Sequence, residues 1–393
     1  MPLRPPSYLA LAAVAWLACH HAGAIRDGSG GQGGEPPDET GGRGPVVDAA
    51  EPREGGAEAG PRDVAVVPAD EGAPLPAPDA AAGGTAAEAL VSGLSLERFR
   101  ANIAALSALG DRAHGSPSFD AAAAWLEKRL TELGYTVEHH AYTYQGQPRI
   151  NLFATKVGSK LPDRMYLVMS HLDGRGGGGG ADDNGSGVSL VLEVARALAG
   201  PGVETDTSVR FCFWDNEETG MQGSAAYVRA RVMRQGMEDP PGSRLFPEPR
   251  WLGAIQHDMM LYDHGFPPGP VQSPTADINV DYQSAARAAA DGKLLAQTFA
   301  AGGARYARDY PVTVGPTMAG SDSVSFQDYT ASISVREARR LEEIIRGSNP
   351  NHHQPTDVYT SYSDADFRLG FNALELTMGT VAELAGARMV ARP

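Results

Sequence analysis

Between residues 165 and 256 the chain alternates short apolar runs with segments of helical periodicity. The apolar runs at 165–170, 208–214 and 251–256 have the length and composition of strands buried on both faces. The segments between them, 188–198 and 224–233, place apolar residues at helical spacing. An order of strand, helix, strand, helix, strand pairs the strands in parallel and packs helices on the sheet. We therefore expect an α/β fold in which a mostly parallel, mixed central sheet is sandwiched by helices.

Further helices and strands are expected before and after this core. Ser95 begins one amphipathic helix, and a second is capped by Ser118 and stopped by Gly134. The additional elements are expected at residues 95–109, 121–133, 135–144, 150–157, 284–300, 331–335 and 364–387. Two long stretches rich in proline and glycine, 263–275 and 301–320, are expected to be loops. Loops of that length inside a compact domain are usually functional or disordered.

Residues 1–24 have the layout of a secretory signal peptide. Positive charge at Met1–Arg4 precedes a short apolar run, Tyr8–Ala18, and small residues follow. The apolar run is too short to span a bilayer. Leu17-Ala18-Cys19 is similar to a bacterial lipoprotein box, so two outcomes stay open: cleavage after Ala22–Ala24, or attachment of a lipid to Cys19. Both predict an extracytoplasmic protein that is secreted, periplasmic or an outer-membrane lipoprotein. The lipid at Cys19, which belongs to the second outcome, is the only membrane contact expected.

Residues 22–92 are expected to be a disordered linker. They hold thirteen acidic residues and four arginines, and no aromatic residue stands between Trp16 and Phe99. Such a segment cannot bury enough apolar surface to fold, so a single catalytic domain is expected at 93–393. Most of the formal net charge of −15 lies in this linker and says little about the substrate. The sequence has no basic cluster, which argues against a nucleic-acid partner.

The chain has two cysteines, Cys19 and Cys212. Whichever way residues 1–24 are processed, Cys212 has no partner, so the exported protein must be stable without an intramolecular disulfide. We expect Cys212 to be a buried apolar residue.

Acidic and histidine side chains follow three successive strands of the expected sheet. A lone residue of this kind is more often a structural histidine, a solvated acid or a helix cap than a ligand. The carboxyl ends of parallel strands meet at one rim, however, and crowded carboxylates would repel each other there unless a cation joined them. The pattern therefore predicts a metal site. The candidate residues are His171, Asp173, Asp183, Glu217, Glu218 and Asp258.

Two other motifs overlap this region. Gly176–Gly180 invites comparison with a phosphate-binding loop, but the Gly-Lys-Ser/Thr ending is absent and the neighbouring carboxylates would repel a phosphate. Asn184-Gly185-Ser186 fits an acceptor pattern for N-glycosylation, but a glycan there would block the rim. Neither motif displaces the metal hypothesis.

Four short motifs resemble those of the co-catalytic zinc aminopeptidases, a family that includes glutamate carboxypeptidase and glutaminyl cyclase. The first, Gly-Ala-Asp-Asp-Asn-Gly-Ser-Gly, covers residues 180–187, and Asn-Glu-Glu-Thr-Gly covers 216–220. Gly-Ser-Asp covers 320–322 and His-Gln-Pro-Thr-Asp covers 353–357. The motifs occur in the order expected of that family over the chain from Leu94 onward. The resemblance implies a single phosphorylase/hydrolase-like zinc peptidase domain that acts on peptides.

The resemblance further implies two zinc ions (Zn²⁺) per chain. Asp183 would bridge them, His171 and Asp258 would bind one, and Glu218 and His353 would bind the other. Three carboxylates against two divalent ions leave one net positive charge, which favours a bound hydroxide and stabilises the oxyanion formed when it attacks an amide. Nitrogen and oxygen ligands without cysteine suit a catalytic zinc pair with open positions.

Other roles follow from the same resemblance. Glu217 would be the catalytic base, Asp173 would orient His171 from outside the ligand set, and Asp322 would belong to the substrate pocket. A cis peptide bond is expected after Asp183. His352 directly precedes His353, so the two histidines compete for one ligand position, and the following Pro-x-Asp favours His353.

The function expected is an exopeptidase that hydrolyses the N-terminal peptide bond, in other words an aminopeptidase. A carboxypeptidase of the same fold would need a cation for the substrate carboxylate, and Arg175, Arg336 and Arg339 are candidates. A glutaminyl cyclase-like acyltransferase is associated by resemblance with a single zinc ion. A catalytically inactive binding module would have lost ligands. Retention of all five ligand residues favours the hydrolase over these last two alternatives.

Overall fold

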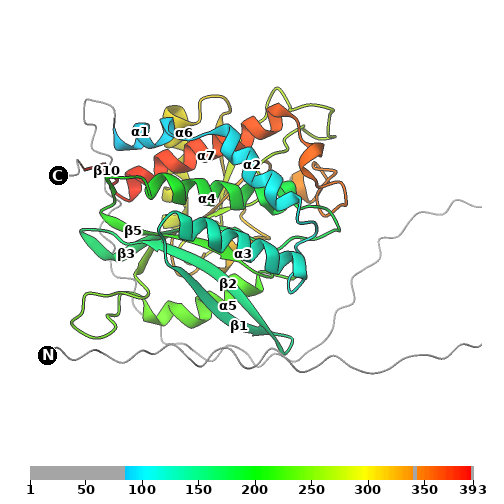
Figure 1. The fold of residues 1–393 in the computed structure, drawn as a ribbon. Coiled ribbons are helices and arrows are strands. Elements are labelled where there is room, and N and C mark those ends of the chain that lie inside the picture. The colour runs from blue at the N-terminus through cyan, green and yellow to red at the C-terminus, as the bar shows by residue number, and fades with distance from the viewer. Residues whose placement is uncertain (1–84, 340–342, 391–393) are drawn as a thin grey trace, which may run out of the picture. The chain divides into compact units, whose positions relative to one another are not determined.

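The computed structural model describes residues 85–339 and 343–390 (Figure 1). The expected signal peptide and most of the expected linker lie outside the described residues. The end of that linker is folded, because Ala86–Ser92 forms helix α1, with Ala87 and Leu90 buried. Thr85 and Glu88 make a reciprocal capping box at its start. A capping signal and two apolar side chains thus suffice to form one short helix before residue 93, the expected start of the catalytic domain.

The central sheet has eight strands in the order β1-β2-β5-β3-β6-β9-β7-β8. They are β1 Val137–Tyr144, β2 Gln147–Lys156, β3 Leu161–His171, β5 Thr207–Trp214, β6 Arg250–His257, β7 Ile278–Tyr282, β8 Val312–Gly315 and β9 Ser332–Arg336. The central strands β5, β3, β6 and β9 are parallel, whereas β1 with β2, β2 with β5, and β7 with β9 pair antiparallel. Short strands β4 Val203–Glu204 and β10 Arg388–Met389 form a second sheet. The expected mixed, mostly parallel sheet is confirmed.

Helices cover both faces of the sheet. The longer helices are α2 Leu96–Ser107, α3 Pro117–Glu132, α4 Gly187–Leu198, α5 Gln222–Arg231, α6 Ala289–Tyr306 and α7 Asp364–Leu384. Figure 1 shows α2, α4 and α7 on one side of the sheet and α5 on the other. Helix α4 packs against β3 and β5, and helix α6 packs against β7 and β8. Among the described residues, no helix combines the length and the apolar composition needed to cross a membrane.

The central strand β3 shows why the sheet is buried on both faces. Tyr166 and Val168 point into the large core beneath α4 and α7, and neither is exposed. Their neighbours Met165, Leu167 and Met169 point into a second cluster on the face of α5, which also contains Cys212. Successive side chains of a strand alternate between faces, so a continuous apolar run serves two cores. The expectation that Cys212 is buried and apolar is confirmed.

Three local expectations need correction. The N-cap of α3 is Ser116 rather than Ser118, because Pro117 occupies the first helical position, where its missing N–H costs nothing. Half of the expected loop at 301–320 is regular, since α6 continues to Tyr306 and β8 follows. Glycines there read as loop formers but serve close packing: a Cβ on Gly302 would lie 2.3 Å from Thr380 Oγ1. The strand β7 was not expected at all.

Candidate metal centre

The carboxyl ends of the parallel strands deliver the expected side chains to one rim. His171 is the last residue of β3 and pairs with Trp214, the last residue of β5. On the other side of β3, Met169 pairs with Gln256 of β6, two residues before His171 and Asp258 respectively. The register alone therefore places His171 between the acidic turn that follows β5 and the Asp258 that follows β6.

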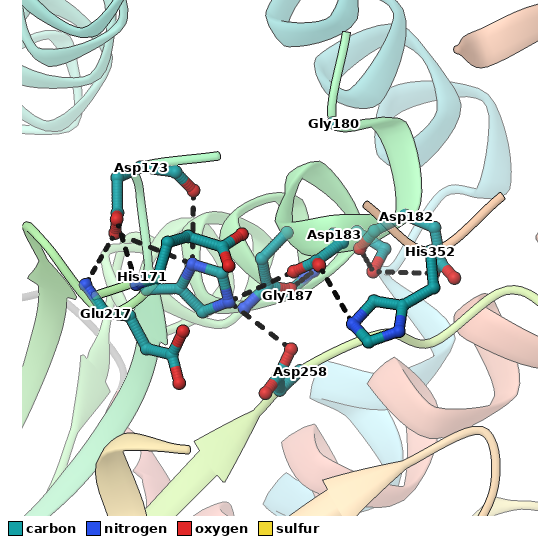
Figure 2. A network of polar contacts seen from close by, with 12 residues as sticks. His171, Asp173, Gly180, Asp182, Asp183, Gly187, Glu217, Asp258 and His352 are labelled. Atoms are coloured by element: carbon teal, nitrogen blue, oxygen red, sulfur yellow. Dashed lines mark hydrogen bonds and ion pairs between the residues drawn. The ribbon is translucent and has the colours of Figure 1, made fainter. Parts of the chain in front are cut away.

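One cluster joins His171, Asp183 and Asp258. The His171 Nε2 atom lies 3.3 Å from Asp183 Oδ1 and 3.3 Å from Asp258 Oδ1 (Figure 2). One potential ligand atom from each residue lies within 4.8 Å of the other two, and all three residues are buried. A pair of carboxylates and an imidazole converging in this way form one half of the expected ligand set.

The second cluster uses the other oxygen of Asp183. His353 Nε2 lies 3.2 Å from Asp183 Oδ2 and 2.9 Å from Glu218 Oε2. His352 Nε2 is 3.6 Å from the same Asp183 oxygen, and its ring lies against that of His353. His353 thus contacts both acids of the expected half-site. Asp183 presents one oxygen to each cluster, which is the arrangement that a bridging ligand requires.

Asp183 is fixed by its backbone as well as its side-chain partners. The Asp183–Asn184 peptide bond is cis, as expected. Asp357 accepts hydrogen bonds from the Asp182 N–H at 2.9 Å and from the Asp183 N–H at 3.0 Å. The Asn184 side chain donates to the His257 carbonyl at 2.9 Å. These bonds tie the turn that carries Asp183 to the loop after His353 and to the end of β6.

Asp173 connects the acidic turn to His171. Its carboxylate accepts from the Glu217 N–H at 3.1 Å and from the Glu218 N–H at 3.2 Å. Its backbone carbonyl lies 3.1 Å from His171 Nδ1, whereas its carboxylate is 3.6 Å away. The backbone carbonyl of Asp173 is therefore placed to orient His171, whereas its carboxylate mainly holds the Glu217–Glu218 turn. Figure 2 shows Asp173 joined by dashed lines to both His171 and Glu217.

The charges of the centre call for a cation. Burial opposes the charged form of His171. Hydrogen bonds to Asp173, Asp183 and Asp258 nevertheless hold the pKa of His171 well above its ordinary value. Burial and the nearby Asp183 raise the pKa of Glu218 to about 7. Its Oε1 atom is buried and has no hydrogen-bond partner. Buried carboxylates that compete for protons, with an unsatisfied oxygen, fit a bound divalent metal, and nitrogen and oxygen donors suit zinc.

A cavity of about 180 Å³ opens onto these side chains. It is lined by Arg175, Asp183, Glu217, Glu218, Gly220, Met221, Asp258, Met259, Gly320, His352 and His353. Asp322 is not on this wall: it is fully buried and accepts from Gln256 Nε2 at 3.3 Å. The expectation that Asp322 belongs to the substrate pocket stays a prediction.

Two buried arginines support the centre in ways that the sequence did not indicate. Arg112 is fully buried and donates to the carbonyls of Leu172, Gly179 and Gly180. Arg336 is 3.3 Å from Asp258 Oδ2 and pairs with this ligand rather than lining the cavity. Neither arginine stands in a motif that signals its role. Of the supporting residues, the sequence marked Asp173 and also Asp357, the last residue of the His-Gln-Pro-Thr-Asp motif.

Comparison with known proteins gives a consistent result. The model of peptidase family M28 matches residues 151–374. Leupeptin-inactivating enzyme 1 of Streptomyces exfoliatus is 33% identical over 159 residues, which cover 39% of this chain and 36% of that enzyme. The probable lipoprotein aminopeptidase LpqL of Mycobacterium tuberculosis is 40% identical over 95 residues, or 24% of this chain and 18% of that protein. The chain thus matches about a third or less of these relatives' length.

The fold has solved counterparts. The structure of BSAP, a zinc aminopeptidase from Bacillus subtilis, superimposes with a TM-score of 0.57 at 16% identity and covers 74% of this chain and 95% of that chain. At this identity the likeness concerns the fold.

Proposed function

Because the chain belongs to peptidase family M28, a family of metal-dependent peptidases, we propose that it is a two-zinc exopeptidase that removes the N-terminal residue of peptides. The observation that carries the proposal is the position of Asp183, whose two oxygens face His171 at 3.3 Å and His353 at 3.2 Å. Relatives named as aminopeptidases support the amino end as the site of attack.

Five side chains would hold the metal. His171 and Asp258 would bind one zinc ion, Glu218 and His353 the other, and Asp183 would bridge them. Two zinc ions in these positions would polarise the substrate carbonyl and make a water molecule acidic enough to attack it. Asp173 would keep His171 in one tautomer, because its carbonyl accepts the Nδ1–H and leaves Nε2 free for the metal.

Glu217 is the proposed general base. It lines the cavity beside Glu218, and its backbone N–H is held by Asp173 at 3.1 Å. Burial, together with the negative charges of Asp322 and Asp258, raises the pKa of Glu217 well above its ordinary value. A carboxylate with a raised pKa can take a proton from the attacking water and return it to the leaving amine.

The cavity wall bears on which end of a peptide binds. Among the described residues that line it, Asp183, Glu217, Glu218 and Asp258 are acidic. Three of these would bind the two zinc ions, so Glu217 is the carboxylate left to accept an ammonium group. Arg175 is the one arginine on that wall and the observation that favours a carboxypeptidase as second candidate. Arg336 pairs with Asp258, and Arg339 is exposed. The choice of the amino end therefore rests on the relatives named as aminopeptidases.

The proposal is tested with matched chromogenic substrates. We expect zinc-dependent release of p-nitroaniline from leucyl-p-nitroanilide and none from its N-acetyl analogue. Chelation should abolish the activity and added zinc should restore it. Release of the C-terminal amino acid from an N-acyl dipeptide would instead establish the carboxypeptidase, and cyclisation of an N-terminal glutamine would establish the acyltransferase. A chain that binds peptides without cleaving them would be an inactive module.

We also propose that the protein acts outside the cytoplasm on peptide substrates. The support is the signal-like layout of residues 1–24 and a relative named as a lipoprotein. Metabolic labelling with a palmitate analogue distinguishes the two outcomes. Label lost in Cys19→Ser establishes lipidation, whereas an unlabelled, soluble product supports cleavage after Ala22–Ala24.

A further inference from the structure

We propose that the glycine loop, Gly176–Gly180, sets the zinc affinity of the half-site that contains Glu218 and His353. This inference rests on the proposed two-zinc function. The loop leaves the rim after Asp173 and returns to it at Asp183, so it runs between two functional residues. It has no side chains of its own, and its role must come from what its backbone contacts.

One side of the glycine loop is held by two consecutive residues. Asp111 accepts a hydrogen bond from the Gly177 N–H at 2.8 Å. Arg112 is fully buried and donates to the Gly179 carbonyl at 2.5 Å and to the Gly180 carbonyl at 3.0 Å. Hydrogen bonds from a buried guanidinium are strong and directional. The loop backbone is therefore anchored to the segment between α2 and α3.

The other side of the glycine loop contacts the segment that carries His353. A Cβ added to Gly176 would lie 2.3 Å from the carbonyl carbon of His353 and 2.4 Å from its oxygen. A Cβ on Gly178 would lie 2.6 Å from the Gln354 carbonyl oxygen and 2.9 Å from that of Asp357. A side chain at either position would clash with backbone atoms of the His353 segment, so the glycine loop and that segment could not keep their present contact.

The two half-sites are supported differently. His171 ends β3 and Asp258 directly follows β6, so the sheet holds both of them. His353 lies in a loop, has a positive φ of 55°, and its side chain is 31% exposed. A shift of a few tenths of an ångström in that loop would misplace His353 and leave His171 where it is. The glycine loop therefore acts as a positioning element for His353.

Gly177 provides a matched control within the same loop. Gly176 and Gly177 both have positive φ, 93° and 79°, so alanine strains the backbone at either position. A Cβ on Gly177 has only Pro355 Cγ within 4 Å, at 4.0 Å. The pair Gly176→Ala and Gly177→Ala thus shares the backbone cost and differs in contact with His353. Gly178→Ala adds a steric contact at a glycine without positive φ.

The experiment measures zinc binding rather than activity. Metal-free full-length protein is titrated with Zn²⁺ against a chromophoric chelator, which resolves the two binding steps. His353→Ala and His171→Ala identify which step belongs to which half-site. We expect Gly176→Ala and Gly178→Ala to weaken the His353 step about 10–100-fold, the usual effect of losing support for a ligand. The His171 step should stay unchanged in Gly176→Ala, and Gly177→Ala should match the wild type. Gly178→Ala also meets Asp357, which accepts the Asp183 N–H, so it should weaken the His353 step more than the His171 step. Circular dichroism verifies that each variant is folded.

Three outcomes overturn the inference. They are wild-type binding by folded Gly176→Ala and Gly178→Ala, an equal loss in Gly177→Ala, and equal weakening of both steps. If Gly176→Ala does not fold, Gly178→Ala decides by the same criteria. Wild-type protein that binds one zinc ion would refute the two-zinc proposal separately. The affinity of that single binding step would then be measured in the same variants. If His353→Ala weakens the step but Gly178→Ala does not, the role of the glycine loop is overturned.

Discussion

Replacing Asp173 with asparagine should impair catalysis without removing a metal ligand. The Asp173 carboxylate accepts two backbone N–H groups, from Glu217 at 3.1 Å and from Glu218 at 3.2 Å. Asparagine offers one oxygen and places an NH₂ group against the other N–H. The carbonyl that faces His171 belongs to the backbone and is retained. The variant therefore perturbs the turn that carries the proposed base, Glu217, and one proposed zinc ligand, Glu218.

The magnitude follows from one lost hydrogen bond. A buried donor left without an acceptor costs about 1–3 kcal/mol. If the misplaced Glu217 raises the activation free energy by the same amount, kcat/KM falls by about 5–150-fold, since about 1.4 kcal/mol corresponds to a factor of ten. The assay is hydrolysis of leucyl-p-nitroanilide by protein whose zinc content has been measured.

Asp215→Asn is the matched control. Asp215 is a buried carboxyl group near the same rim, and burial together with the charge of Asp173 raises its pKa to about 7. A neutral amide is therefore a mild change at Asp215, and kcat/KM should stay close to the wild-type value. Wild-type kcat/KM in zinc-replete Asp173→Asn, or an equal loss in Asp215→Asn, would refute the role assigned to Asp173.

The remaining predictions concern the base, the metal and the core. Glu217→Gln should keep both zinc ions and lose roughly 10²–10⁴-fold in kcat; full activity in the metal-replete variant would remove Glu217 from the mechanism. Zinc at a free concentration of 100 Kd should stabilise the fold by about 2.7 kcal/mol per site, measured by denaturant unfolding with and without chelator; an unchanged midpoint would contradict it. Glu248→Gln should lower the free energy of unfolding by about 3–5 kcal/mol, because buried Arg210, 2.7 Å from Glu248, loses its counter-ion. The control, Glu138→Gln at an exposed position, should leave the free energy of unfolding unchanged. Equal free energies of unfolding in the two variants would refute this prediction.

The parts of the fold that could be predicted are those in which burial dictates the pattern. The apolar run in β3 serves two cores, so its length, burial and parallel pairing followed from the sequence. The strand ends then located His171 and Asp258 without further information. Glycines gave the opposite result: in α6 they permit close helix packing but were read as loop formers. The structural role of a glycine depends on the residues that pack against it, and these cannot be identified from the sequence alone.

The clustering of the candidate side chains could be predicted for a similar reason, whereas the contacts that support them could not. Carboxylates and histidines at converging strand ends mark a centre because their charges need compensation. Asp322 is also an acidic residue in a recognised motif, yet it is fully buried in a short turn and does not line the cavity. Arg112 supports the glycine loop through backbone carbonyls, which leave no trace in residue identity. Such contacts depend on packing between distant segments.

The most direct test of the two-zinc centre is a zinc-edge anomalous map from crystals of the zinc-loaded protein. The structure places Asp183 between His171 and His353, so two peaks about 3.5–4 Å apart are expected, one on each side of its carboxylate. A single peak, or two peaks with Asp183 bound to only one of them, would contradict the bridging role from which the proposed chemistry follows.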